Sequence, residues 1–299
     1  MSVYVASILT NMALISFLAL SAYLVLVVGV VSFGQQAFFG VGAYVTATVT
    51  SIYGGHAVTG VFIGMLSGAA CALVLAILTV RLSGLYFAIS TLCFAELCRL
   101  GLLQVRAPFD IDGRTTGPDG PEGFSNIRWI FEHNYSVQDF LVLTTVCLVA
   151  LLGLLFLLER SRIMLRARLV GQDSILAQSL GLRPILYRIV FVTLSGGVAG
   201  FGGGLFALFN TYIEPNMFGV MLGVHGLAYA VIGGLGAPIG PLIGVAIDIG
   251  LLESIRAISA YRMIAFGGLV ALLLILLPQG LISPRFVARM RRWRKLFHV

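Results

Sequence analysis

Charged residues are scarce in this sequence, and the shortage excludes an ordinary soluble domain. Only 10% of the 299 residues are charged and 59% are hydrophobic, whereas about 25% of residues are charged in an average soluble domain. No charged residue of either sign occurs before Arg81. Apolar runs of about 20 residues, the length that spans a bilayer, recur along the chain. The sequence therefore predicts an all-α, polytopic transmembrane helical bundle.

Lysine is almost absent, and this excludes one common way of using ATP. A P-loop needs a lysine that reaches the β- and γ-phosphates, but the single lysine is Lys295, in the C-terminal tail. No glycine cluster follows a soluble strand in the G-x-G-x-x-G arrangement that binds dinucleotides. We therefore expect no cofactor bound by this chain, no catalytic residue and no enzyme activity.

The residues that usually bind metals are few and scattered. The four cysteines lie in apolar segments without a C-x-x-C pair, and the four histidines include no H-E-x-x-H motif. Metal sites need such ligands at defined spacing, so no metal site is predicted. His225 is the one histidine inside an apolar segment, where it either lines a cavity or packs as a buried, hydrogen-bonded side chain.

The apolar runs, separated by polar or glycine-rich interruptions, predict about nine spanning helices, with a range of eight to ten. We expect one transmembrane domain over residues 1–284, followed by a basic tail at 285–299. The predicted helices are 4–31, 37–53, 57–80, 85–104, 137–158, 187–212, 218–235, 239–254 and 262–278.

The net charge of +7 is concentrated in two places, which argues for membrane orientation and against nucleic acid binding. Arginines gather at 160–188 and again in the tail, and short loops rich in arginine face the cytoplasm. The loop at 160–186 and the C-terminus are therefore predicted to be cytoplasmic. Helix counting then places the acidic loop at 105–135 outside, together with the N-terminus.

Glycine-rich sequence interrupts the apolar runs twice, once in each half of the chain. We call residues 32–44 (SFGQQAFFGVGAY) the first break and residues 233–244 (GGLGAPIGPLIG) the second break. Non-helical backbone at membrane depth lies where protein buries it or water reaches it, so paired breaks indicate a transport pathway. The alternative is a pair of tight turns at the membrane surface. The candidate pathway residues are Gly34, Gln35, Gln36, Phe38, Gly40, Gly42, Gly233, Gly234, Gly236, Pro238 and Gly240.

A third glycine cluster, SGGVAGFGGG at 195–204, has a different pattern. Gly196, Gly200 and Gly204 recur at intervals of four, which places them on one face of a helix and lets another helix approach closely. This cluster is predicted to serve helix packing.

Three ionisable residues are expected within the membrane, where such groups are often functional. Glu96 and Arg99 are three residues apart and can pair on one helix face. Asp248 lies in the eighth predicted helix, near Glu253 and Arg256. These residues would serve either structural pairing or an ion-coupled transport mechanism.

The segment RARLVGQDSILAQSLGLRPILYRIVF, residues 166–191, is too polar in its centre to span a bilayer. The central QDSILAQSLGL is weakly amphipathic and is bounded by Gly171 and Pro184. Two interpretations stay open. It is either an interfacial helix that rests on lipid headgroups or a docking surface for a cytoplasmic partner.

Six blocks of sequence, in order from about residue 20 to 283, together resemble one family. The resemblance is to the permease subunit of ABC importers for branched-chain amino acids, a LivM-like family that also includes urea and amide importer permeases. The blocks are SFGQQAFFGVGAYV, RLSGLYFAISTLCFAEL, TTGPDGPEGF, SLGLRPILYRIVFVTLSGGVAGFGGGLFA, VIGGLGAPIGPLIGVAI and LLPQGLI.

The resemblance implies a division of labour in the bacterial inner membrane. A second, homologous permease subunit would complete the pathway, two cytoplasmic ATP-binding subunits would supply energy, and a periplasmic solute-binding protein would deliver a small amino-acid substrate. The breaks would then let helices meet tip to tip beside the pathway. Residues 171–183 match the segment that couples to the ATPase, with contacts expected at Gly171, Gln172, Asp173, Ala177, Leu180, Gly181 and Arg183.

Overall fold

The computed structural model describes residues 2–111, 114–127, 129–132, 135–252, 262–277 and 280–282. The basic tail at 285–299 and the predicted neighbours Glu253 and Arg256 lie outside the described residues.

Every predicted apolar segment forms a helix, with bounds close to those expected from the sequence. The helices are α1 (Val3–Val27), α2 (Gln35–Ser51), α3 (Ala57–Thr79), α4 (Gly84–Gln104), α6 (Val137–Glu159), α9 (Pro184–Asn210), α10 (Val220–Gly233), α11 (Gly240–Val245) and α12 (Arg262–Leu276). Helix α11 is followed directly by a π-helical stretch, η3 (Ala246–Leu252).

Five of these helices, among the described residues, are long and apolar enough to cross a membrane: α1, α3, α4, α6 and α9. Helix α2 has 17 residues and α10 has 14, which is shorter than the roughly 20 residues that a bilayer requires. Helix α2 begins at residue 35, inside the first break, and α10 ends at residue 233, where the second break begins. The chain is thus a helical, multi-pass membrane protein, and the count of nine crossings stays a prediction.

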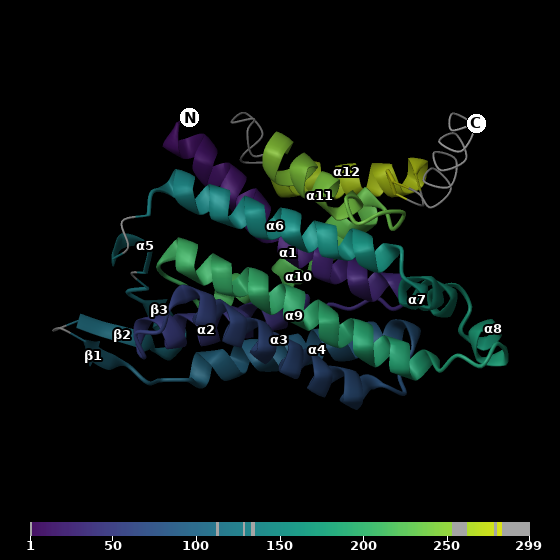
Figure 1. The fold of residues 1–299 in the computed structure, drawn as a ribbon, viewed down its shortest axis with the longest axis horizontal. Coiled ribbons are helices and arrows are strands. Elements are labelled where there is room, and N and C mark those ends of the chain that lie inside the picture. Colours follow the sequence, from purple (N-terminus) through teal and green to yellow (C-terminus); the bar gives the residue numbers. More distant parts are fainter. Residues whose placement is uncertain are drawn as a thin grey trace.

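The loop at 105–135 contains a small antiparallel sheet, which the all-α prediction missed (Figure 1, left). Strand β1 (Phe109–Ile111) pairs with β2 (Arg114–Pro118), and β2 pairs with β3 (Phe124–Ser125). Between them lies the 3₁₀ turn η1 (Gly120–Glu122), and the short helix α5 (Trp129–Glu132) follows. Strands β1 and β3 are too short to show an alternation of polar and apolar residues, and β2 contains a glycine and a proline.

This sheet is tied to the connection between α9 and α10. The backbone N–H of Phe124 donates to the carbonyl of Ile213 over 2.7 Å, and Ile213 donates back over 3.1 Å. The 3₁₀ turn η2 (Pro215–Phe218) follows, and Phe218 packs near Tyr44 of α2. The sheet end of the bundle is therefore held together by segments from both halves of the chain.

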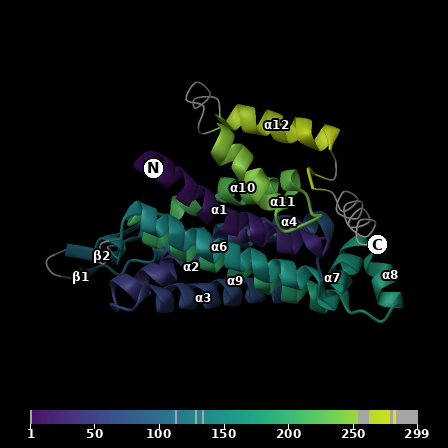
Figure 2. The same ribbon diagram turned by 45° about the horizontal axis from the view of Figure 1, so that its top comes forward.

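The opposite end carries two short helices, α7 (Arg162–Gln172) and α8 (Ser174–Ser179). In Figures 1 and 2 they lie at the right, beyond the ends of the long helices, whereas the sheet lies at the left. Helix α6 runs between the two ends. The sequence places the 105–135 and 160–186 loops on opposite sides of the membrane, and the structure has them at opposite ends of the bundle.

Helix α9 is at the centre and packs against α1, α2 and α3. The predicted close approach at its glycines is confirmed: a methyl group added to Gly200 would lie 2.6 Å from the carbonyl oxygen of Gly64, and one added to Gly68 would lie 2.6 Å from that of Gly196. Because lipid tails are as apolar as the helices, close van der Waals contact must hold such helices together.

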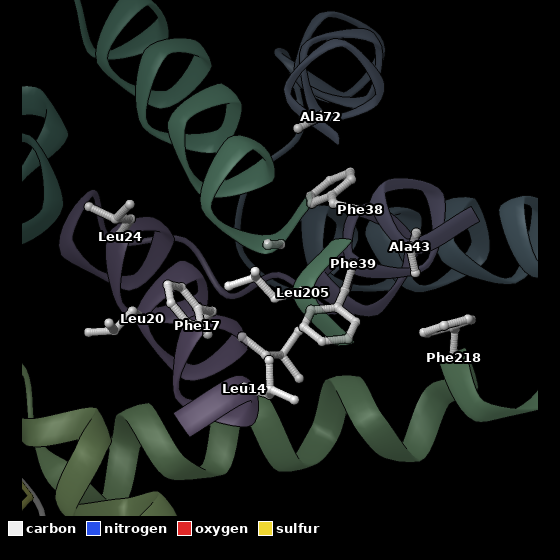
Figure 3. Packing of buried hydrophobic residues seen from close by; sticks show 14 of the residues in the cluster. Leu14, Phe17, Leu20, Leu24, Phe38, Phe39, Ala43, Ala72, Leu205 and Phe218 are labelled. Carbon is white, nitrogen blue, oxygen red and sulfur yellow. The ribbon is translucent and has the colours of Figure 1, made fainter. Parts of the chain in front are cut away.

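Large side chains fill the space on the other faces of α9. Phe17 from α1, Phe39 from α2 and Leu205 from α9 point toward one another (Figure 3), and all are buried. In contrast, α3, α4 and α6 leave many large apolar side chains exposed, including Val58, which is 81% exposed. These outer faces suit lipid.

Candidate functional site

The first break is mostly helical, because only residues 32–34 of it lie outside α2. Gly40 lies against the ring of Phe218, and Gly42 lies against the backbone of Gly200. Neither position has room for a Cβ atom. The glycines of α2 therefore allow close helix packing, and Phe38 is fully buried beside them.

Two glutamine side chains at the start of α2 are the unusual feature of this break. Gln35 and Gln36 are each 1% exposed. Ser32 donates a hydrogen bond of 3.1 Å to Oε1 of Gln35, but within the described part of the chain Nε2 of Gln35 and both amide atoms of Gln36 have no partner. An unpaired buried polar group costs about 1–3 kcal/mol.

The Gln36 amide lies directly against Gly223 of α10. It therefore places a polar group with free hydrogen-bonding capacity in the seam between the first half of the chain and α10. Gly34, the residue before α2, lies against Leu75 of α3. Of the predicted pathway residues in this break, the two glutamines are the ones with unused polar atoms.

The second break is an ordered hairpin between α10 and α11. Gly233 packs on the backbone of Gly240, and Gly244 packs on the backbone of Tyr229, so the two helices lie side by side. The expectation that they meet tip to tip is wrong. Since glycine has no Cβ atom, the two backbones can make direct contact along the hairpin.

The turn of this hairpin is fixed by its own backbone and by a later segment. Gly234 ends α10 with a φ of 90°, a conformation that favours glycine. Leu281 donates to the carbonyl of Ile232 and Ile282 to that of Gly233, and Gly236 donates to the carbonyl of Ile282, all over 2.9 Å. Pro238 is buried in the same turn.

Glu96 and Arg99 form the ion pair that their spacing predicts. The guanidinium of Arg99 donates to both carboxylate oxygens of Glu96 at 2.5–3.0 Å. A third donor of Arg99 reaches Oδ1 of Asn216 in η2 at 2.9 Å. The pair therefore joins α4 to the connection before α10.

Asp248 is buried at the wall of a cavity. It lies in the π-helical stretch η3, is 1% exposed, and accepts a hydrogen bond of 2.5 Å from the Tyr229 hydroxyl. Helical turns of the π type occur often at functional sites. The cavity has a volume of about 250 Å³ and is lined by Asn11, Ile15, Leu222, His225, Tyr229, Asp248, Ile249 and Phe266.

His225 therefore lines a cavity, with its ring 5.0 Å from that of Phe266 between centroids. Sequence reasoning found His225 and Asp248 but missed Tyr229 and Asn11. Tyr229 and Asp248 are 19 residues apart, a spacing that predicts no contact within a single helix. They come together because the hairpin folds α11 back along α10.

The segment 171–183 contains α8, whose outer face is apolar and exposed. Ile175 is 80% exposed, and Leu180, at the end of the helix, is 63% exposed. Asp173 caps α8, since its carboxylate accepts hydrogen bonds from the N–H groups of Ile175 and Leu176. An exposed apolar tip at a bundle end is suited to a protein partner.

The predicted contact residues of this segment fall into two groups. Gln172, Asp173, Leu180, Gly181 and Arg183 are exposed. Ala177 is only 1% exposed, and Gly171 lies against the backbone of Gly29, so both face the rest of the molecule.

Two exposed residues of α8, Ile175 and Leu176, were missing from the predicted contacts. Their position on the outer face follows from the cap at Asp173, which sets where the helix begins.

Among the residues that the structure describes, no three His, Cys, Asp or Glu side chains are grouped in positions that could hold a metal ion. The candidate sites are the glutamines of α2 with their unpaired amide atoms, the polar cavity at Asp248 and the exposed tip of α8.

Comparison with known proteins gives a consistent set of relatives. A family model described as "branched-chain amino acid transport system / permease component" matches residues 4–278. The chain is 32% identical over 276 residues to the high-affinity branched-chain amino acid transport system permease protein LivM of Escherichia coli, and 31% identical to LivM of Salmonella typhimurium. In both cases 85% of this chain and 64% of the relative are covered.

A second type of relative is also similar. The chain is 30% identical over 185 residues to a probable branched-chain amino acid transport permease protein LivH of Methanocaldococcus jannaschii, covering 58% of this chain and 57% of the relative. The aligned part of this chain thus covers slightly less than two thirds of the length of the LivM relatives. No solved structure matches the chain.

Proposed function

Since the chain belongs to the family of branched-chain amino acid transport permeases, we propose that it is the permease subunit of an ATP-binding-cassette importer. It would form part of a transmembrane pathway for branched-chain or other small amino acids. Separate ATPase subunits would bind ATP and supply the energy.

The observation that carries this proposal is the exposed apolar tip of α8. Ile175, Leu176 and Leu180 are each more than half exposed at the end of the bundle, next to the arginine-rich α7. A partner that covers this tip would remove apolar surface from water, at about 25 cal/mol per Å². The segment that resembles the family's coupling segment is the one that presents this surface.

The proposed partners follow from the family. They are a second, homologous permease subunit, two cytoplasmic ATP-binding subunits and a periplasmic solute-binding protein, assembled in the bacterial inner membrane. The α7–α8 end and the C-terminus would face the cytoplasm, in agreement with their arginines. The sheet end, with the 105–135 loop, would face the periplasm.

Substrates of similar size define the nearest alternatives. An importer permease for urea or short amides would have the same architecture and the same partners. An independent ion-coupled amino-acid carrier is a second class of function, which the buried Asp248 and its cavity favour. This alternative predicts transport by the purified chain alone, with the loss of transport in Asp248→Asn.

Co-purification from the native membrane tests the proposal. The tagged chain is extracted in mild detergent and the bound polypeptides are identified by mass spectrometry. We expect an ATPase pair and a second permease to be recovered, and to be lost when Ile175, Leu176 and Leu180 are together replaced by serine.

A matched control replaces the lipid-facing Val142, Val146 and Val149 of α6 by alanine, which should leave the complex intact. Recovery of the chain alone, together with solute transport by the chain alone in liposomes, would instead support the carrier.

A further inference from the structure

Helix α7 touches segments from both halves of the chain, and Arg168 makes the most specific of these contacts. Its guanidinium donates to the carbonyl oxygen of Leu235, in the turn of the second break, over 2.8 Å. It also donates to Oε1 of Glu159, at the end of α6, over 2.6 Å. The Arg168 side chain is 23% exposed and that of Glu159 is 13% exposed.

Tyr23 completes this cluster from the last turn but one of α1. Its hydroxyl donates to Glu159 and accepts a hydrogen bond of 2.9 Å from Arg168. A guanidinium has several donors in a rigid fork, so one side chain can hold several acceptors in fixed positions. Arg168 thereby joins the ends of α1 and α6 to the α10–α11 turn.

One turn further along α7, Gly171 contacts the chain that leads into the first break. A methyl group added to Gly29 would lie 2.5 Å from the carbonyl oxygen of Gly171, so the two backbones are in direct contact. Residues 30–34 continue from Gly29 to the start of α2 and its buried glutamines. One short helix therefore contacts the turn of the second break and the approach to the first.

Helix α8 is connected to α7 without a flexible linker. Asp173 is both the C-cap of α7 and the N-cap of α8, so a single residue joins the two helices. A partner that displaces the exposed tip of α8 would therefore displace α7 with it. The second break would follow, because Leu235 is held by Arg168.

We propose that Arg168 is a positioning residue that transmits movement of α8 to the α10–α11 turn through the carbonyl of Leu235. The inference rests on the proposed function of the chain as an importer permease, and it assigns the transmission to this one side chain. The Glu159–Arg168 pair joins the end of α6 to α7, while the bond to Leu235 carries the movement.

The experiment measures leucine uptake and ATP hydrolysis in parallel, with the purified complex in proteoliposomes. Arg168→Gln removes the charge and the fork, and we expect leucine transported per ATP hydrolysed to fall by about tenfold or more, as for the loss of a hydrogen bond to a charged group. ATP hydrolysis itself should persist. Arg166→Gln is the matched control, because Arg166 is exposed on the same helix; its ratio should equal that of the parent.

Two further variants separate transmission from stability. Glu159→Gln breaks the ion pair but leaves Arg168 able to reach Leu235, so it should lower thermal stability and keep the ratio near the parent value. Arg168→Lys keeps the positive charge beside Glu159, but an ammonium is a poor substitute for the fork, so its ratio should fall. If Glu159→Gln and Arg168→Gln lowered the ratio of leucine transported to ATP hydrolysed equally, the Glu159–Arg168 pair would have only a structural role.

Each outcome decides the proposal. An unchanged ratio in an assembled Arg168→Gln complex overturns it, and if that variant does not assemble, an unchanged ratio in Arg168→Lys overturns it. Failure of the proposed function is recognised separately, because the parent chain would then purify without an ATPase and show no ATP-driven uptake.

Discussion

The two glycine-rich breaks have similar composition but different structures. In the first break, Gly40 and Gly42 lie inside α2 and let that helix pack closely against Phe218 and α9. In the second break, Gly233 and Gly240 lie on either side of a turn and bring two backbones into contact. The first is a packing surface within one rigid helix, and the second is a reversal of the chain.

The difference shows that glycine content alone does not identify a transport pathway. Glycine allows two things, a close approach of helices and unusual backbone angles, and each break uses mainly one of them. In the first break, the groups that would face the proposed pathway are the two buried glutamines. The second break is a turn that Arg168 and residues 280–282 hold in place.

The largest effect is expected for Gly42→Leu. A side chain at this position would collide with the backbone of Gly200 in the centre of the bundle. Overpacking a core costs about 1–3 kcal/mol or more, and here the obstacle is backbone, which cannot rotate away. We expect loss of monodisperse protein in size-exclusion chromatography.

Gly153→Leu is the matched control for this variant. Gly153 lies on the exposed face of α6, where an added Cβ atom meets nothing within 4 Å, so normal yield is expected. Normal assembly of Gly42→Leu would contradict the packing role of the first break.

A smaller effect on assembly, with a large effect on transport, is expected for Gly234→Ala. The φ of 90° at this residue would strain alanine by about 1–3 kcal/mol. The strain would displace the turn without removing the α10–α11 contact. Uptake by the reconstituted complex should fall while the subunits still co-purify, and wild-type uptake would show that this turn has no special backbone requirement.

Tyr229→Phe tests how firmly the second hairpin is held. The variant removes the hydroxyl that donates to buried Asp248, at an expected cost of about 1–3 kcal/mol. We expect a lower melting temperature in detergent. The comparison variant is Ser90→Ala. Its hydroxyl donates to the backbone carbonyl of Tyr86 in the same helix, and its loss should change the melting temperature little.

The smallest effect on stability is expected for Gln36→Met in the first break. Methionine has a similar volume, and it would remove a buried amide that has no hydrogen-bond partner among the described residues. Replacement of such a group by an apolar one is nearly neutral or stabilising.

Transport should nevertheless fall in Gln36→Met, because this amide is one of the two that the first break would offer to the proposed pathway. A variant with unchanged stability and unchanged uptake would remove Gln36 from the proposed pathway.

The sequence predicted the parts of this structure that depend on local patterns. Each apolar run became a helix, and Glu96 and Arg99 paired as their spacing allows. The interval of four between Gly196 and Gly200 correctly indicated close helix packing. These features need only the period of an α-helix and the length of a bilayer.

Features that depend on long-range contact were not predictable in the same way. The pairing of Phe124 with Ile213 joins residues far apart in sequence, and strands of two to five residues carry too little pattern to be recognised. The Tyr229–Asp248 bond required the α10–α11 hairpin, and the Arg168–Leu235 bond required both that hairpin and α7. The burial of Ala177 depends on which face of α8 meets α9.

The glycine contact among α2, α3 and α9 also has a consequence for biosynthesis. Helix α3 ends at residue 79 and α9 begins at residue 184, so at about 5–20 residues per second the ribosome needs roughly 5–20 s to supply the missing partner. During that time Gly42 and Gly68 lack their backbone contacts with Gly196 and Gly200 of α9. A nascent chain that stops before α9 keeps this surface uncovered, and we expect membrane quality control to recognise it.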